Sequence, residues 1–325
     1  MQLLPTATST DVQKQQPRVA VLPVGSFEQH GKYLPLITDT AIACVIAQEM
    51  AAAYPVHLLP PITISCSHEH AAFPGTVSIS ARTLYAVIDD IRASLARSGI
   101  HKLVIVNGHG GNYVLSNVVQ EANVDGPAVS LFPLGLDWDR AREHGGLASD
   151  RHADMHAGEV ETSILLHAAP ELVREGYADA DHDGGARPFL LMHGTGNYTE
   201  SGVIGFPSLA SAGKGKAILE SLTGDFAEHL RALGEAAVPT TPDADGHIHN
   251  PVIDRLRTVD RSQASRRFGG TVLAWQLSRC SAPTTSPFPS LCRRLWNTVR
   301  CSRVPGWSSS SWTFSAIRQT RTSVI

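Results

Sequence analysis

The sequence predicts an α/β fold, in which helices cover both faces of a mostly parallel central sheet. Across the first 240 residues, short apolar runs alternate with longer segments whose apolar residues recur at helical spacing. Such alternation is typical of parallel strands that are joined by helices. Glycine-rich polar loops follow two of the predicted strands, at the carboxyl ends where sheets of this class gather their ligands.

The first hundred residues supply five predicted elements. The apolar run 18–24 is predicted to be a buried strand that ends in a Pro/Gly loop. An Ala-rich helix over residues 40–53 follows, and residues 56–59 and 62–65 are predicted to be short strands around two prolines. Apolar residues at helical spacing predict a helix over residues 80–98, which the next glycine would cap.

Beyond residue 100, the clearest predicted strand is the run 102–106, and a glycine-rich loop follows it directly. A proline at position 170 is expected to stop the helix that precedes it. The other predicted elements are helices over residues 113–123, 157–168 and 213–233 and a strand over residues 128–132.

The net charge of −3 combines two unlike parts of the chain. Residues 1–250 contain 15 Lys and Arg against 28 Asp and Glu, whereas residues 251–325 contain 12 Arg, no Lys and two acids. An acidic body argues against a nucleic-acid-binding face there. No run of about eighteen apolar residues is present, so we expect no membrane span. The polar first residues lack the apolar stretch of a secretory signal, so we expect a cytoplasmic location.

We expect three parts: a flexible N-terminal arm (1–17), one enzyme domain (18–240) and a basic Ser/Arg-rich tail (241–325). Four of the five tryptophans lie in the tail, and no strand or helix period persists from residue 251 onward. This composition favours a disordered segment, or one of non-native origin such as an out-of-frame or read-through product. The alternative is a basic interaction tail, for which salt-dependent DNA binding would be expected.

Four short segments far apart in the chain carry acidic and imidazole side chains among glycines. Together they offer ligands that suit borderline divalent metals, with no thiolate among them. A hydrolase uses such metals to make hydroxide near neutral pH. The segments are Glu28-Gln29-His30-Gly31, Thr38-Asp39-Thr40, Asn107-Gly108-His109-Gly110-Gly111-Asn112 and His156-Ala157-Gly158-Glu159-Val160-Glu161-Thr162.

The first three segments each have a metal-binding and a simpler interpretation. In an extended backbone Glu28 and His30 face the same side, and Asp39 could bridge two metals through its two oxygens. The alternatives are a solvated acid with a satisfied histidine, and an Asp39 that caps a helix. His109 lies between glycines, where the backbone can approach a metal closely. A phosphate-binding loop is disfavoured there, because the lysine and spacing of such loops are missing.

The fourth segment is predicted to begin a helix. His156 and Glu159 would share a helix face, whereas Glu159 and Glu161 diverge, so both acids could serve one site only through an irregular first turn. The alternative is that one glutamate complements the helix dipole. A serine or cysteine nucleophile is disfavoured, because no nucleophile elbow is present and Cys44 and Cys66 lie in apolar or strand-like surroundings.

Taken in order, and with the stretch SHEHAAFPGTVSIS at 67–80, these segments resemble the creatininase (creatinine amidohydrolase) family from about residue 19 to residue 233. The resemblance implies a three-layer α/β/α domain, a homo-oligomer that is commonly a hexamer, and two divalent ions (Zn, Fe or Mn). Matching motif positions imply five metal ligands, with Asp39 bridging: Glu28, His30, Asp39, His109 and Glu161. His156 matches a histidine that handles protons in catalysis, and Glu159 would be a ligand or a proton carrier.

Two departures from creatininases proper argue against creatinine as the substrate. The acid that they carry two residues after the loop histidine is Gly111 here, and residues 150–153 occupy the stretch of their tryptophan. The resemblance is therefore to the broader branch, with its formamide-releasing deformylases and a peptidase of a modified peptide precursor. We expect hydrolysis of a formamide, a cyclic amide or a modified peptide by a hydroxide that bridges two metals. The alternatives are a non-catalytic oligomeric scaffold and creatininase proper.

Overall fold

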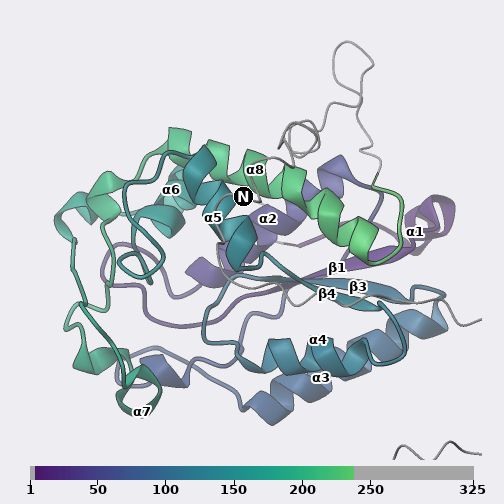
Figure 1. The fold of residues 1–325 in the computed structure, drawn as a ribbon, viewed down its shortest axis with the longest axis horizontal. Coiled ribbons are helices and arrows are strands. Elements are labelled where there is room, and N and C mark those ends of the chain that lie inside the picture. Colours follow the sequence, from purple (N-terminus) through teal and green to yellow (C-terminus); the bar gives the residue numbers. More distant parts are fainter. Residues whose placement is uncertain (1–3, 238–325) are drawn as a thin grey trace, which may run out of the picture. The chain divides into compact units, whose positions relative to one another are not determined.

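Four parallel strands form the central sheet of the computed structural model, which describes residues 4–237 of the chain (Figure 1). Their order across the sheet is β2-β1-β3-β4. The strands are β1 (Val19–Val24), β2 (His57–Leu58), β3 (Lys102–Asn107) and β4 (Val129–Phe132). The predicted strand over 62–65 does not form, because Ile62 makes only an isolated parallel bridge to Val24. The predicted tail (241–325) lies outside the described residues.

Helices cover both faces of this sheet, so the predicted three-layer α/β/α architecture is confirmed (Figure 1). One face carries α2 (Thr38–Ala53), α5 (Gly135–His144), α6 (Glu159–Ala168) and α8 (Ala212–Ala232). The other face carries α3 (Ala81–Arg97) and α4 (Val114–Ala122). Two short helices complete the set, α1 (Ser9–Gln15) within the predicted N-terminal arm and α7 (Leu190–His193). Short 3₁₀ turns are η1 (His68–His70), η2 (Pro170–Leu172), η3 (Tyr177–Asp179), η4 (Thr195–Asn197) and η5 (Pro207–Leu209).

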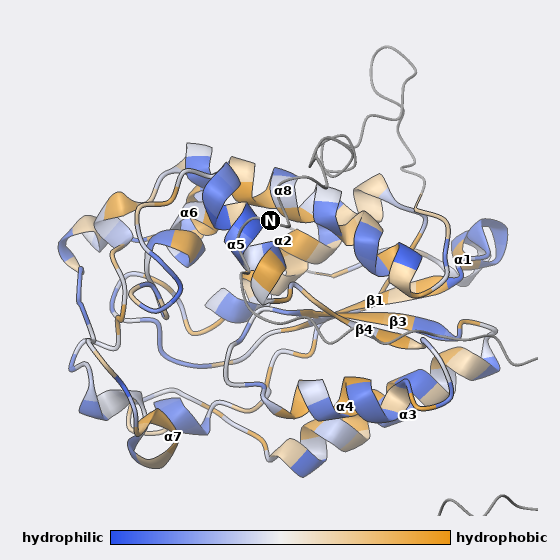
Figure 2. Cartoon of the chain, in the orientation of Figure 1, coloured by the Kyte–Doolittle hydropathy of each residue, from blue (hydrophilic) through white to orange (hydrophobic). Residues whose placement is uncertain are grey.

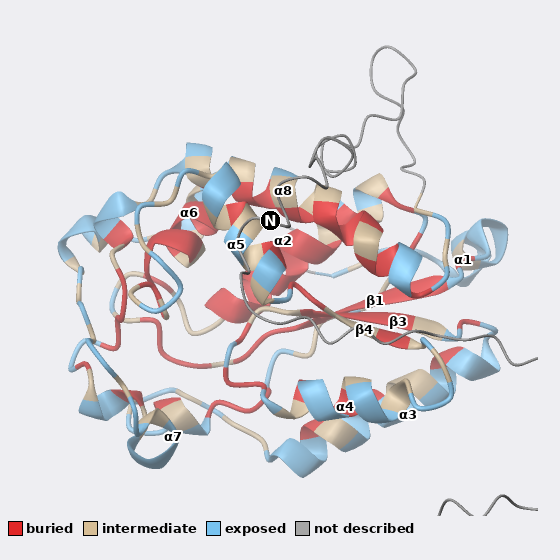
Figure 3. Ribbon diagram, viewed as in Figure 1, coloured by how far each residue is buried: buried red, intermediate tan, exposed pale blue. Residues whose placement is uncertain are grey.

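Alternate side chains of the central strands enter two separate hydrophobic cores. In β1, Val19 and Val21 pack with α2, α6 and α8, whereas Ala20 and Leu22 pack with α3 and α4. This division follows from the period of two along a strand. Buried, apolar strands therefore lie between helices whose outer faces are polar and exposed (Figures 2 and 3). Within residues 4–237, none of the helices has the length and apolarity that a membrane crossing needs.

The start of α6 differs from the prediction. The helix begins at Glu159, and His156 precedes it in an isolated bridge with Ile204. Ala157, between them, has a positive φ of 55°, which a helix does not contain. The expectation that His156 and Glu159 share a helix face is therefore wrong.

Two glycines, which follow β1 and β3, allow the first turn of α2 to pack closely against the ends of these strands. A Cβ on Gly25 would lie 2.3 Å from the Thr40 backbone, and a Cβ on Gly108 would lie 2.3 Å from the carbonyl oxygen of Asp39. Only glycine allows this close approach. As a result, the first turn of α2, with Asp39 in it, lies against the ends of both central strands.

Candidate metal centre

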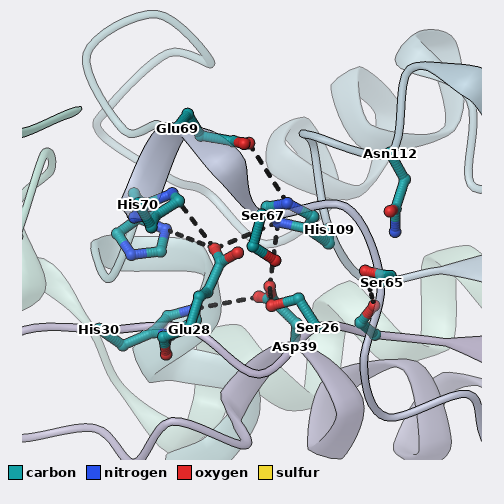
Figure 4. Close-up of polar contacts among 12 residues, drawn as sticks. Ser26, Glu28, His30, Asp39, Ser65, Ser67, Glu69, His70, His109 and Asn112 are labelled. Atoms are coloured by element: carbon teal, nitrogen blue, oxygen red, sulfur yellow. Dashed lines mark hydrogen bonds and ion pairs between the residues drawn. The ribbon is translucent and has the colours of Figure 1, made fainter. Parts of the chain in front are cut away.

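Residues from β1, α2 and β3 meet in a buried cluster at the carboxyl end of the sheet (Figure 4). Glu28 follows β1, Asp39 lies in the first turn of α2, and His109 follows β3. The Nδ1 atom of His109 lies 3.2 Å from Glu28 Oε1 and 3.1 Å from Asp39 Oδ2. All three side chains are at most 5% exposed.

The second oxygen of Asp39 faces another histidine. His30 Nε2 lies 3.0 Å from Asp39 Oδ1 and 3.9 Å from Glu161 Oε2, which comes from the first turn of α6. The hydroxyl of Ser26 donates a hydrogen bond of 2.6 Å to Asp39 Oδ2. The carboxylate of Asp39 is therefore shared between two neighbouring groups of ligand atoms, as a bridging ligand would be.

Three histidines of the cluster are oriented by backbone carbonyls. The Nδ1–H group of His30 donates to Glu28 O (3.0 Å). The Nε2–H groups of His109 and His156 donate to Cys66 O (2.9 Å) and Gln29 O (2.6 Å), respectively. The other nitrogen of each ring faces the acids. Histidines that bind metals are usually held in this way, because the outer hydrogen bond fixes the tautomer and the direction of the ring.

The donor atoms of the cluster fall into groups that could each hold a cation. Ligand atoms that lie within 4.8 Å of one another define three groups among the described residues: Glu28/Asp39/His109, His30/Asp39/Glu161 and Glu28/His30/His156. The first two groups share Asp39 and together contain the five predicted ligands. The third group adds His156, for which the family resemblance implies proton transfer.

Glu28 provides the test of whether a cation fits this site. Both its carboxylate oxygens are buried, and neither makes a hydrogen bond of good geometry within residues 4–237. Oε1 has imidazole nitrogens of His109 and His70 at 3.2 and 3.3 Å, whereas no ion-pair contact from the described part of the chain reaches Oε2. A buried carboxylate without partners is costly unless a cation or other donors compensate it. A divalent ion among Glu28, Asp39 and the facing imidazole nitrogens would supply that compensation, so the residues fit the divalent ions that the resemblance implies.

The acids change the ionisation of the histidines in the metal-free protein. Burial alone would lower the pKa of His30, but the charge and hydrogen bond of Asp39 outweigh it and raise the pKa to about 9. Glu28 and Asp39 likewise overcome burial and raise the pKa of His109 well above its usual range. Burial raises the pKa of Glu161 to about 8. In contrast, burial and the neighbouring His30 lower the pKa of His156.

Glu159 lies apart from the cluster, although the family resemblance implies a ligand or proton-carrier role for it. Its buried carboxylate accepts hydrogen bonds from the backbone N–H groups of Ala148 and Ser149, and it pairs with the Nζ atom of Lys214. These contacts link α6 to the loop after α5 and to the start of α8. The structure therefore brings together the other six predicted residues and gives Glu159 a structural environment.

Two site residues come from η1, in the stretch 67–80 that contributed to the family resemblance but supplied no predicted site residue. His70 Nε2 lies 3.3 Å from Glu28 Oε1, and Glu69 Oε1 lies 3.3 Å from His109 Nε2 (Figure 4). His70 differs from the three histidines above, because its Nδ1 accepts a hydrogen bond from the Gln29 amide. That amide is oriented by Gly202 O and Gly31 N. His70 therefore presents an N–H group, and no free nitrogen, to Glu28.

A cavity of about 260 Å³ opens beside the cluster. His109, His156 and Glu161 form its inner wall. Trp138, Arg142 and Arg151 also line it, and the two arginines pair with Asp154 and Asp139. A substrate in this cavity would contact the candidate metal ligands directly. A three-layer α/β/α domain with such a buried cluster of acids and imidazoles is typical of enzymes that use divalent metal ions.

Comparison with known proteins identifies the family. The family model described as "Creatininase: Creatinine amidohydrolase" matches residues 5–230. The chain is 34% identical over 261 residues to the mycofactocin precursor peptide peptidase of Mycobacterium ulcerans (strain Agy99), an alignment that covers 75% of this chain and 94% of that protein. The chain therefore belongs to the creatininase family, and it is a hydrolase.

Two further comparisons support this assignment. The creatinine amidohydrolase of Pseudomonas putida is 27% identical over 245 residues, which cover 66% of this chain and 88% of that protein. A solved structure of a creatininase mutant superposes with a TM-score of 0.59 at 22% identity, covering 69% of this chain and 95% of that one. The structural match confirms the fold that the sequence predicts.

Proposed function

We propose that this protein hydrolyses an amide bond with two divalent metal ions held in the buried cluster. The observation that carries the proposal is the buried carboxylate of Glu28, which makes no hydrogen bond of good geometry within the described residues and lies amid imidazole nitrogens that backbone carbonyls orient toward the acids. One ion would be held by Glu28, Asp39 and His109, and the other by His30, Asp39 and Glu161. Zinc, iron and manganese all suit such mixed ligands.

The residues around the cluster would then have separate roles. Bound metals supply a water of lowered pKa and polarise the amide carbonyl. His156 would accept a proton at Nδ1 and deliver it to the leaving nitrogen, since its Nε2–H is committed to Gln29 O. Burial and the neighbouring His30 lower the pKa of this histidine, so its imidazole is neutral at neutral pH and Nδ1 carries a free lone pair.

The amide of a modified peptide is the substrate class that we favour. Support comes from the similarity to a mycofactocin precursor peptide peptidase at 34% identity, compared with 27% to a creatinine amidohydrolase. The cavity beside the cluster also offers the Trp138 ring and two arginines, each paired with an aspartate, for contacts remote from the reacting bond. Formamides and cyclic amides remain the other members of the class to be tested.

A substrate screen of the metal-loaded protein tests this proposal. We expect hydrolysis of a peptide amide, formamide or cyclic amide, loss of that activity with a chelator, and recovery when Zn²⁺ or Mn²⁺ is added back.

Asp39→Asn should reduce activity to background, because the bridging charge is lost. Asp89→Asn, which removes an exposed acid paired with Arg92 on α3, should have no effect. Activity that survives both the chelator and Asp39→Asn would contradict the proposal. A well-folded protein without hydrolysis of any of these amides would favour the scaffold alternative.

A further inference from the structure

We propose that Glu69 is a positioning residue of the metal centre, which holds His109 through the ring nitrogen facing away from the other ligands. The inference rests on the proposed function, because it assumes that His109 binds a metal. Its basis is the contact between η1, which carries Glu69, and the glycine-rich loop after β3, which carries His109.

The two nitrogens of His109 face different surroundings. Nδ1 lies among Glu28 and Asp39, where a metal would bind. Nε2 faces Cys66 O at 2.9 Å and Glu69 Oε1 at 3.3 Å, on the opposite side of the ring. The Glu69 side chain is 16% exposed, so solvent screens this contact only in part. A carboxylate at the outer nitrogen makes a metal-binding imidazole more basic and fixes its tautomer.

Gly111 makes room for this carboxylate. A Cβ at position 111 would lie only 1.7 Å from Glu69 Oε1 and 2.4 Å from His109 Nε2. The space that a side chain of residue 111 would fill is therefore occupied by the acid of another loop. A Cβ on the neighbouring Gly110 would meet nothing within 4 Å, so the close contact with Glu69 and His109 is specific to position 111.

The backbone of η1 is also held in place. The buried hydroxyl of Thr195, in η4, donates a hydrogen bond of 3.0 Å to the carbonyl oxygen of Glu69. A Cβ on Gly194 would lie 2.7 Å from the same oxygen, so the two segments pack closely. Because its backbone is fixed in this way, Glu69 has a defined position beside His109.

Zinc affinity of the full-length protein, measured by competition with a chromophoric chelator, tests the proposal. We expect Glu69→Gln to weaken Zn²⁺ binding by about tenfold, the lower end for lost outer-shell partners, because Cys66 O still orients the ring. The unfolding temperature of the metal-free protein should stay unchanged, which separates positioning from a structural role. Glu69→Asp, which keeps the charge, should retain more affinity than Glu69→Gln.

Matched variants complete the test. His68→Gln changes an exposed residue of η1. The His68 ring contacts Ser78, so this variant should leave Zn²⁺ affinity unchanged. Gly111→Ala should weaken binding, whereas Gly110→Ala should not. Wild-type affinity in Glu69→Gln would overturn the role of Glu69 and leave the proposed function intact. A wild-type protein that binds no Zn²⁺ would overturn the proposed function, and this inference with it.

Discussion

At the scale of residues, side chains of the cluster carry protons that metal ions would displace. His30 and Glu161 have pKa values of about 9 and about 8 in the metal-free protein, so both are largely protonated at neutral pH. Metal ligands must be deprotonated before they bind. Protons and metals therefore compete for the same side chains.

Metal affinity should consequently depend on pH. We expect Zn²⁺ affinity to rise with pH and to level off above about 9, where His30 has lost its proton. Loading at neutral pH should release protons, which calorimetry in buffers of different ionisation enthalpy measures. An affinity that is constant across this range would show that these two groups are not ligands.

Glu159 has a structural environment, so its removal should affect stability more than chemistry. We expect Glu159→Ala to lower the free energy of unfolding by about 3 kcal/mol, because Lys214 loses its buried partner. Turnover measured well below the unfolding temperature should change little. Denaturant unfolding with activity assays checks this, with the exposed Glu143→Ala as control, expected within about 0.5 kcal/mol of wild type. Lost turnover at unchanged stability would restore the catalytic role.

At the scale of elements, the site depends on how α2 meets the strands. We expect Gly25→Ala to cost about 1–3 kcal/mol of stability and to weaken metal binding, because the added Cβ would displace the turn that carries Asp39. Gly224→Ala, in α8, meets nothing within 4 Å and should instead stabilise the protein by about 0.5–1 kcal/mol. Thermal unfolding and metal titration of both variants measure these effects. Equal behaviour of the two would contradict the role of Gly25.

The sequence predicted the elements that carry strong periodicity, and it missed those that lack it. Residues 102–106 lie in β3, and residues 80–98 contain α3. A strand that is buried on both faces leaves a continuous apolar run in the sequence, and a helix that is buried on one face leaves apolar residues at helical spacing. The polar helix α5 has no such pattern. Glu69 and His70 were missed as site residues because a 3₁₀ turn has no characteristic spacing. Their position depends on contacts with distant residues such as Thr195.

At the scale of the whole molecule, the buried residues of the two hydrophobic cores run from Val19 to Leu233, with Ala237 packed against one of them, as far as the structure describes the chain. The family match likewise ends at residue 230. We therefore expect a chain that stops after residue 240 to keep the unfolding temperature and metal content of the full protein. Circular dichroism and elemental analysis of both chains check this. A truncated chain that fails to fold would show that the remaining residues contribute to the domain.

The homo-oligomer implied by the family resemblance also stays a prediction at this scale. Sedimentation of the metal-loaded protein at several concentrations measures its mass. We expect an assembly larger than one chain, and a monomer at all concentrations would contradict this.

A bridging Asp39 requires two metal ions, one on either side of its carboxylate. Anomalous diffraction from crystals grown with Zn²⁺ would reveal them, because the peaks locate each ion without reference to activity. We predict two peaks, one among Glu28, Asp39 and His109 and one among His30, Asp39 and Glu161, with Asp39 bound to both. Crystals that show no zinc in this cluster would mean that Asp39 bridges no metal ions.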